Sequence, residues 1–317
     1  MFGSRSEAAE KGPLPTVFGG VHMGVCLFDF RDLPRLPDTL AYVDTLVDAC
    51  RQVGAGLVEI NARNLEPASD LPHAGIPRLW DEAPTGPPAM LEAYRRMRPG
   101  EVRAARDHLR KWRVSTPPRF FGEVRQKFAD AGLTPFAYGF TFTPDMSDAE
   151  IDAAFRQARA LGVRVFGTGA TRIEMAPRLV PYAEHYRMDL GFHNHTATQN
   201  PNEVASRESL ERLLSLSPRV KINLDVGHFT AADQDVMAFV HERLDRISHF
   251  HMKDRKRGLG PGTPWGEGDA PLAELLRYVR ERGSDVPAIV EYEYRGTGGG
   301  VAETRRCFDY MKWALGA

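Results

Sequence analysis

Cysteine is scarce in this sequence, and the few cysteines present form no pattern. Cys26, Cys50 and Cys307 lie far apart, and no Cys-x-x-Cys pair occurs. A disulfide framework or a cysteine-based zinc site is therefore not expected. A reducing compartment, by default the cytoplasm, is expected instead.

The sequence also lacks an excess of charge of either sign. Its 41 Lys and Arg residues nearly cancel its 42 Asp and Glu residues, which leaves a net charge of -1. Proteins that follow a phosphate backbone usually carry a basic excess, so no nucleic-acid partner is expected.

Long apolar runs are missing as well. No uninterrupted run approaches the ~18 residues that cross a membrane, so no membrane association is expected. Residues 1–20 carry charged side chains and no continuous apolar stretch, which argues against a secretion signal. We expect this segment to be a flexible leader and residues 21–317 to form one catalytic domain.

What the sequence does contain is a repeated unit, in which an amphipathic helical stretch leads through a glycine turn into a short β-rich run. Clear copies span Tyr42–Ile60, Phe121–Phe142 and Asp148–Gly167. Glycine suits the turn because it accepts the positive φ at which a helix ends. The unit therefore predicts helices that feed directly into strands.

Continued along the chain, this alternation predicts eight main helices and eight strands. The expected strands are Met23–Phe28, Leu57–Ile60, Leu133–Phe142, Val163–Gly167, Met188–His193, Val220–Asp225, Ile247–His251 and Ala288–Glu293. Such alternation implies parallel pairing with right-handed crossovers, in an open doubly wound sheet or a closed barrel. Eight units in roughly 250 residues favour the barrel, so we predict an α/β fold, a (β/α)8 TIM barrel.

One segment interrupts the alternation of helices and strands in this single domain. Residues 65–100, after the second strand, are rich in proline and glycine and too long for an ordinary βα loop. We expect an inserted loop that serves as a lid, as decoration, or as a contact to a second copy or an accessory subunit. The basic stretch Arg110–Arg113 that follows is expected to form an exposed helix end.

Polar side chains concentrate at the ends of the last four predicted strands. These ends read His193-Asn-His195, Asp225-Val-Gly-His228, His249-Phe-His251-Met-Lys253 and Glu291-Tyr-Glu293. Parallel strands buried on both faces should be apolar, so charged groups there need partners. Barrel enzymes place their active sites at these strand ends, and a divalent ion is one partner that suits all four.

The two-residue period of a strand groups these side chains further. His249, His251 and Lys253 share a face, as do Glu291 and Glu293. The period does not say which face points into the barrel, so both orientations stay open.

At Asp225-Val-Gly-His228, His251-Met-Lys253-Asp254 and Val290-Glu291 the sequence resembles the xylose-isomerase-like barrel superfamily, which includes ketose 3-epimerases, inosose dehydratases and endonuclease IV. Because the motifs fall in order on strands five to eight, the resemblance covers nearly the whole chain. It implies one divalent metal ion, with Mn2+ as the first choice and Mg2+, Co2+ or Zn2+ as alternatives.

The resemblance also implies a set of metal ligands. Asp225, His251 and Glu291 occupy the ligand positions of strands six to eight. The epimerases have a glutamate on strand five, where this sequence has His193, in a His-x-His pattern similar to that of inosose dehydratase relatives. His193 is expected as a ligand or as the base, with Glu203 as the alternative fourth ligand.

Five further residues are expected to contact the substrate. His228 and Arg257 fall where relatives bind substrate, three residues after the aspartate and six after the histidine. Trp265 lies in a stretch that resembles a glycine-rich loop over the site, where it would stack on a sugar face or cap the barrel. Glu59 and Glu293 complete the set.

These features predict a metal-dependent isomerase or epimerase of a sugar, keto-sugar or polyol that works through an enediolate. The metal would polarise a substrate carbonyl, and the candidate acids and bases are His193, His195, Lys253, Glu291 and Glu293. Loss of a β-substituent from the same intermediate would be dehydration or glycoside elimination, so a lyase is the alternative.

Two other functions compete with this prediction. A DNA-repair endonuclease of this fold needs a three-zinc cluster with more histidines, but strands two and three end in Glu59-Ile-Asn61 and Phe140-Thr-Phe142, and no histidine follows His251. That function is therefore not expected. A non-catalytic sugar-binding barrel stays open, and metal content together with isomerisation assays would distinguish it from an enzyme.

Overall fold

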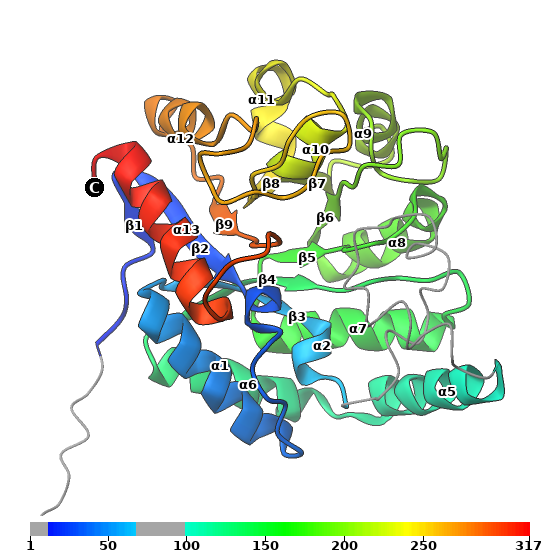
Figure 1. Ribbon diagram of the computed structural model, residues 1–317. Coiled ribbons are helices and arrows are strands. Elements are labelled where there is room, and N and C mark those ends of the chain that lie inside the picture. The colour runs from blue at the N-terminus through cyan, green and yellow to red at the C-terminus, as the bar shows by residue number, and fades with distance from the viewer. Residues whose placement is uncertain (1–11, 68–98) are drawn as a thin grey trace, which may run out of the picture.

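Eight parallel strands close into a barrel in the computed structural model, which describes residues 12–67 and 99–317 (Figure 1). Each strand pairs with the next along the chain, and the first pairs with the last through Met23 and Ala288. The strands are β2 (Val21–Cys26), β3 (Leu57–Asn61), β4 (Thr134–Gly139), β5 (Val165–Gly167), β6 (Asp189–His193), β7 (Val220–Asp225), β8 (Ile247–Met252) and β9 (Ala288–Val290). The predicted (β/α)8 barrel is confirmed.

A helix follows each strand and packs around the outside of the barrel (Figure 1). These helices are α1 (Thr39–Val53), α6 (Pro118–Asp130), α7 (Asp148–Leu161), α8 (Ala176–Tyr186), α9 (Arg207–Leu214), α11 (Val236–Arg243), α12 (Leu272–Glu281) and α13 (Gly300–Leu315). The glycine turns behave as predicted, because α1 ends at Gly54 and α7 at Gly162, with φ of 86° and 73°.

Further elements lie in the connections between strands and helices. They are the long helix α5 (Pro99–Ser115), the short helices α2 (Ala62–Leu65) and α10 (Val226–Ala231), and the 3-10 turns η1 (Leu27–Phe30), η2 (Ile173–Met175) and η3 (Leu244–Arg246). The predicted inserted loop, 65–100, lies almost entirely outside the described residues.

The expected leader is shorter than predicted. Within 12–20, the strand β1 (Val17–Phe18) pairs antiparallel with the start of β2. Leu14 also donates its backbone N–H to Gly132 O at 3.0 Å. These hydrogen bonds tie the segment to the barrel, so its second half is part of the folded domain.

The hydrophobic core has two parts. A large outer cluster lies between the strands and the helices, and a small inner cluster fills the barrel with Cys26, Leu57, Phe136, Ala137, Val165 and Ile289. All three cysteines are buried and free. The inner cluster is small because the layer nearer the mouth is occupied by polar side chains.

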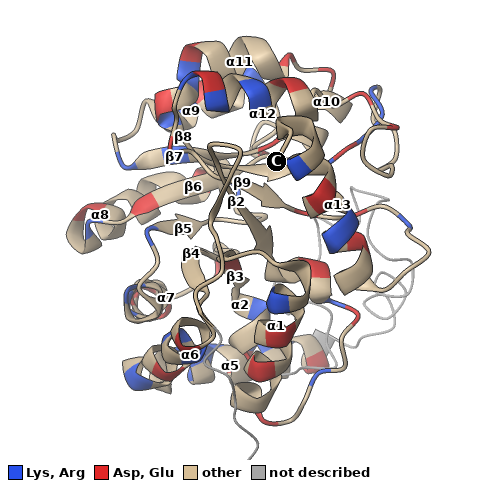
Figure 2. Ribbon diagram, turned by 90° about the vertical axis from the view of Figure 1, so that its left-hand side faces the viewer, with Lys and Arg blue, Asp and Glu red and all other residues tan. Residues whose placement is uncertain are grey.

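Charged side chains lie mainly on the helices and loops around the barrel (Figure 2). Among the described residues, no helix is long and apolar enough to span a membrane.

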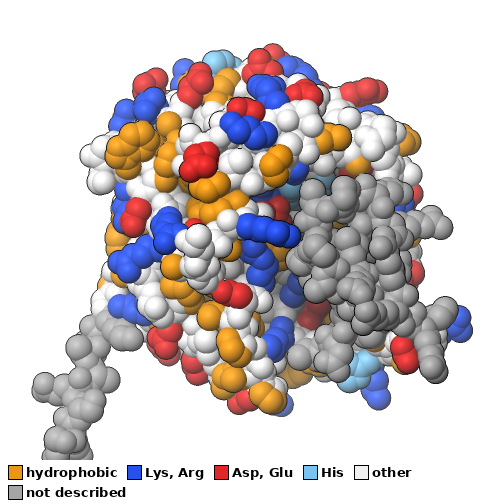
Figure 3. Space-filling model, in the orientation of Figure 1, with side chains coloured by type: hydrophobic (Ala, Val, Ile, Leu, Met, Phe, Trp, Pro, Cys, Tyr) orange, Lys and Arg blue, Asp and Glu red, His pale blue; other side chains and the backbone are white. Residues whose placement is uncertain are grey.

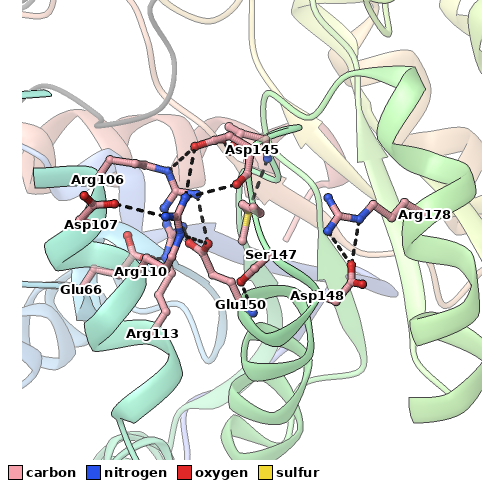
Figure 4. A network of polar contacts seen from close by, with 12 residues as sticks. Glu66, Arg106, Asp107, Arg110, Arg113, Asp145, Ser147, Asp148, Glu150 and Arg178 are labelled. Carbon is pink, nitrogen blue, oxygen red and sulfur yellow. Dashed lines mark hydrogen bonds and ion pairs between the residues drawn. The ribbon is translucent and has the colours of Figure 1, made fainter. Parts of the chain in front are cut away.

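One ion-pair network joins α5 to α7 (Figure 4). Glu150, fully buried in the first turn of α7, accepts from Arg106 at 2.7 Å, Arg113 at 3.0 Å and Arg110 at 3.3 Å. Arg113 also contacts Glu66 at 2.6 Å. The prediction of an exposed helix end at Arg110–Arg113 is therefore wrong for Arg113, because α5 packs this side of the helix against α7.

Candidate metal centre

Four side chains from four successive strand ends converge at the mouth of the barrel. One ligand atom from each of His193, Asp225, His251 and Glu291 lies within 4.8 Å of every other, and all four residues are buried. In the space-filling view, histidine surface is visible in a recess of this face (Figure 3). The structure thus brings together the four residues predicted from the sequence as ligands.

Local backbone structure fixes the position of Asp225 at the end of β7. Its Oδ1 caps α10 by accepting the backbone N–H of His228 at 2.5 Å. Asn194 clamps the same residue, because its side-chain amide bonds to both the backbone N–H and the carbonyl of Asp225, at 2.8 and 3.1 Å. Asp225 Oδ2 is left facing the other three residues.

His193 is a neutral imidazole in this setting. Burial lowers its pKa well below the usual value, and the neighbouring His195 lowers it further. Its Nδ1 is buried and has no hydrogen-bond partner among the described residues. A neutral imidazole with a free nitrogen is the form that binds a metal ion.

His251 lies between two carboxylates. Its Nδ1 is 2.9 Å from Glu291 Oε2, and its Nε2 is 2.6 Å from Glu59 Oε2. Burial opposes protonation of this imidazole, but Glu59 and Glu291 outweigh burial and raise its pKa. Glu59, which we predicted to contact substrate, therefore lies behind His251 and is itself buried.

Lys253 supplies a fully buried ammonium group beside the cluster. Its Nζ lies 2.9 Å from Asp225, 3.0 Å from Glu291 and 2.9 Å from Glu293. Burial disfavours the charge, but these carboxylates raise the pKa of Lys253 above its usual value. Lys253 is thus a protonated hydrogen-bond donor and not a free amine.

The carboxylates respond to burial and to this ammonium in different ways. Burial, only partly offset by Lys253, raises the pKa of Asp225 to about 6. Burial is outweighed at Glu291, where Lys253 and His251 lower the pKa. The site therefore contains at least one carboxylate that is ionised without any added ion.

His228 lies between two cations. Arg255 Nη1 is 2.7 Å from His228 Nδ1, and Lys253 Nζ is 3.1 Å from His228 Nε2. Both cations can only donate hydrogen bonds, so each ring nitrogen faces a donor. Burial and the cations Lys253 and Arg255 lower the pKa of His228, which keeps it neutral. A ring with a cation at each nitrogen is a poor ligand for a further cation, and its contact to a substrate oxygen stays a prediction.

His195 and Glu203 form a second pair at the rim. His195 is 31% exposed on its side chain, and its Nδ1 lies 3.2 Å from Glu203 Oε1, which is buried. Glu203 does not belong to the group of four converging side chains. The structure therefore favours His193 over Glu203 as the fourth ligand and assigns Glu203 to the orientation of His195.

Two predicted substrate contacts lie outside the group of converging side chains. Arg257 is exposed, and its backbone N–H donates to Asp269. Trp265 packs edge-on against Tyr310 of α13, with ring centroids 5.9 Å apart. The loop that carries Trp265 is held by Asp254, which accepts backbone N–H groups of residues 266, 268 and 270.

Replacement of the two arginines should separate their roles. We expect Arg255→Met to lower kcat/KM by about 10- to 100-fold, because loss of a hydrogen bond to a charged donor costs roughly 1.5–3 kcal/mol. Arg257→Met is the matched control and should leave kcat/KM unchanged. Steady-state kinetics checks this, and equal losses in both variants would contradict the assignment.

The sequence prediction did not include three residues that shape the site. Asn194 stands between the two predicted histidines, His249 lies two residues before His251 on the same face, and Arg255 follows Asp254 directly. Proximity to the motif was the only available signal, because the partner of each residue comes from a different strand or loop.

The donor set fits a divalent metal ion. Two imidazole nitrogens and two carboxylates are ligands that Zn2+, Mn2+ and Co2+ accept. Asp225 Oδ2 accepts no hydrogen bond of favourable geometry from the described residues, although Lys253 Nζ is near. Two other groups of close ligand atoms fit less well: one needs His228, and the other combines Cys26, Glu59 and His251, where burial raises the thiol pKa.

The strands form a closed parallel barrel, and a cluster of buried His, Asp and Glu residues lies at their carboxyl ends. These two features define a TIM-barrel protein with a site at its mouth. Residues 150–312, more than half of the chain, match the family described as xylose isomerase-like TIM barrel. The chain belongs to this family, which confirms the resemblance noted in the sequence.

Curated relatives match only over a short region. An inosose dehydratase of Bacillus velezensis is 37% identical over 81 residues, which are 25% of this chain and 26% of that protein. An L-ribulose-5-phosphate 3-epimerase of Salmonella paratyphi B is 25% identical over 96 residues, 30% of this chain and 34% of that protein. The chain thus spans about a quarter to a third of the length of these relatives.

Solved structures share the fold over nearly the whole chain. A sugar phosphate isomerase/epimerase from Parabacteroides distasonis has a TM-score of 0.58 at 15% identity and covers 98% of both chains. The IOLI protein, solved with a zinc atom, has a TM-score of 0.60 at 13% identity and covers 92% of this chain and 97% of that one. At these identities the likeness establishes the fold.

Proposed function

We propose that this protein is a divalent-metal-dependent isomerase or epimerase of a sugar, keto-sugar or polyol. The observation that carries the proposal is the convergence of ligand atoms from His193, Asp225, His251 and Glu291 within 4.8 Å of one another. Family membership and the relatives that act on inososes and ribulose phosphates support it.

The four converging residues would hold the ion, with Mn2+ as the first choice and Zn2+, Co2+ or Mg2+ as alternatives. A bound divalent ion would polarise a substrate carbonyl and stabilise the enediolate that forms when a neighbouring C–H loses its proton. The IOLI protein, which shares the fold, was solved with a bound zinc atom, and this supports a divalent ion in the present protein.

The proton is handled by two pairs that flank His228. On one side, the His195 ring lies 5.4 Å from the His228 ring and is backed by Glu203. On the other side, Glu293 Oε2 lies 3.8 Å from His228 Nε2 and 2.9 Å from Lys253 Nζ. His195 is the candidate base, Lys253 the candidate acid or hydrogen-bond donor, and His228 the candidate contact to a substrate oxygen between them.

A lyase is the second candidate, and two observations favour it. His193 stands on strand five, where an epimerase has a glutamate. The two glutamates that serve an epimerase as bases, one on each face of the substrate carbon, are therefore not both present at these positions. Lys253, protonated and buried, can donate a hydrogen bond to a leaving hydroxyl or glycosidic oxygen and stabilise the charge that develops there. The match to an inosose dehydratase at 37% identity points the same way.

Metal removal and return test the proposal. The purified protein should contain about one divalent ion per chain, and chelation should abolish turnover of a panel of ketoses, inososes and 3-keto-glycosides until Mn2+ or Zn2+ is restored. Product analysis separates epimerisation from elimination. Sugar binding without any turnover, in a protein that retains no metal, would instead identify a non-catalytic barrel.

A further inference from the structure

We infer that Glu59 is a positioning residue that holds His251 with its Nδ1 toward the metal. The inference rests on the proposed metal centre and deepens it. Glu59 lies on β3, whereas the four proposed ligands lie at the ends of β6 to β9.

The two nitrogens of His251 have separate tasks in this geometry. Nδ1 faces Glu291 at 2.9 Å, on the side of the converging ligands, and Nε2 faces Glu59 at 2.6 Å. An imidazole binds a metal through one nitrogen, and the hydrogen bond of the other nitrogen sets its tautomer and orientation. A carboxylate at Nε2 keeps the proton there and leaves the Nδ1 lone pair for the ion.

The neighbouring strands leave room for Glu59. Its side chain is 3% exposed, and Gly139 of β4 and Gly167 of β5 lie beside it. A Cβ added to Gly139 would lie 3.1 Å from Glu59 Oε1, and one added to Gly167 would lie at 3.5 Å. The contact at Gly139 would be tight, so the absence of a side chain there provides space for the carboxylate, whereas the contact at Gly167 would be an ordinary one.

A second histidine lies on the other side of Glu59. His249 Nε2 is 3.2 Å from Glu59 Oε2 but makes no hydrogen bond of favourable geometry with the described residues. His249 Nδ1 lies 2.9 Å from Ser248 Oγ, which donates to Ile222 O of β7 and so accepts from this nitrogen. His251 is therefore the histidine that hydrogen-bonds to Glu59.

The Glu59 carboxylate is a direct partner of His251. Glu59 Oε2 lies 2.6 Å from His251 Nε2, a hydrogen-bond distance. Asn223, whose amide can turn either its oxygen or its nitrogen to the ring, lies 3.2 Å from the same Nε2. Glu59 is thus occupied by His251.

Cobalt binding by Glu59→Gln tests the inference. We expect Co2+ affinity, measured by competition with a chelator, to fall about 10- to 100-fold, with an altered d–d spectrum, because an amide holds the Nε2 proton less firmly. The matched control is Glu303→Gln, which removes another buried carboxylate, held by Tyr294 and Gly298 outside the cluster, and should leave cobalt binding unchanged.

A measurement on the unaltered protein keeps the inference testable if the Glu59→Gln variant does not fold. In the zinc-loaded protein, a long-range 1H–15N spectrum should show His251 protonated on Nε2 and bound through Nδ1. Binding through Nε2, or unchanged cobalt affinity in Glu59→Gln, would overturn the inference. Failure of the unaltered protein to bind Co2+ would instead overturn the proposed metal centre itself.

Discussion

Asp225→Ala should empty the metal site and remove activity together. Asp225 Oδ2 is the buried carboxylate oxygen at the centre of the converging ligands, and nothing else on β7 can replace it. We expect the metal content to fall from about one ion per chain to nearly none. Activity should fall at least about a thousand-fold, which corresponds to roughly 4 kcal/mol of transition-state stabilisation.

Asp225→Asn separates ligation from folding, because asparagine also caps a helix. Its side-chain oxygen can still accept the N–H of His228, so the free energy of unfolding should stay closer to that of the unaltered protein. Metal content by atomic emission and turnover should nevertheless fall as in the alanine variant.

The matched control is Asp189→Asn at the opposite end of the neighbouring strand, where Asp189 pairs with Arg219 at 3.0 Å. It should retain both metal and activity. Full activity in a metal-free Asp225→Ala protein would end the proposal of a metal-dependent enzyme.

Glu150→Ala should cause the largest loss of stability, about 3–5 kcal/mol in the free energy of unfolding. Arg106, Arg110 and Arg113 all turn their guanidinium groups to this one buried carboxylate (Figure 4). Despite burial, Arg106 and Arg113 lower the pKa of Glu150, so it is ionised at neutral pH. Its removal would leave the buried Arg106 with Asp145 and the buried Arg113 with Glu66, so that each loses its fully buried counter-ion.

Denaturant unfolding measures this loss, and the same region offers a control. Asp148 pairs with Arg178 on the surface, with the Asp side chain 75% exposed (Figure 4). Asp148→Ala should change the free energy of unfolding by less than about 1 kcal/mol, because an exposed pair is screened by solvent. Similar losses in the two variants would show that burial does not control the strength of this network.

The barrel could be predicted from the sequence because its signals are local. Glycines such as Gly54 and Gly162 end helices by their own backbone conformation, and short apolar runs follow them at regular spacing. Polar residues at the ends of four successive strands predicted a common site, because parallel strands end on the same side. The family resemblance then singled out His193, Asp225, His251 and Glu291, whose ligand atoms lie close together in the structure.

Other features depended on contacts between distant segments. The proposed role of Glu59 depends on a contact between β3 and β8, which do not pair with each other. Its partner His251 lies 192 residues away in the chain. Arg255 and not Arg257 reaches His228 because the chain turns after Asp254, and only the folded loop shows which guanidinium points inward. Arg113 is buried because α5 packs on α7, and no local pattern in the chain predicts this contact.

The difference between the features that the sequence predicts and those that only the folded structure shows has a physical reason. Helix ends, strand period and the common direction of parallel strands are set by residues a few positions apart, so the sequence reveals the fold and the approximate place of the site. Which nitrogen of His251 faces the ligands, and which groups hold it there, is set by close packing of side chains from strands far apart, and only the tertiary structure decides it.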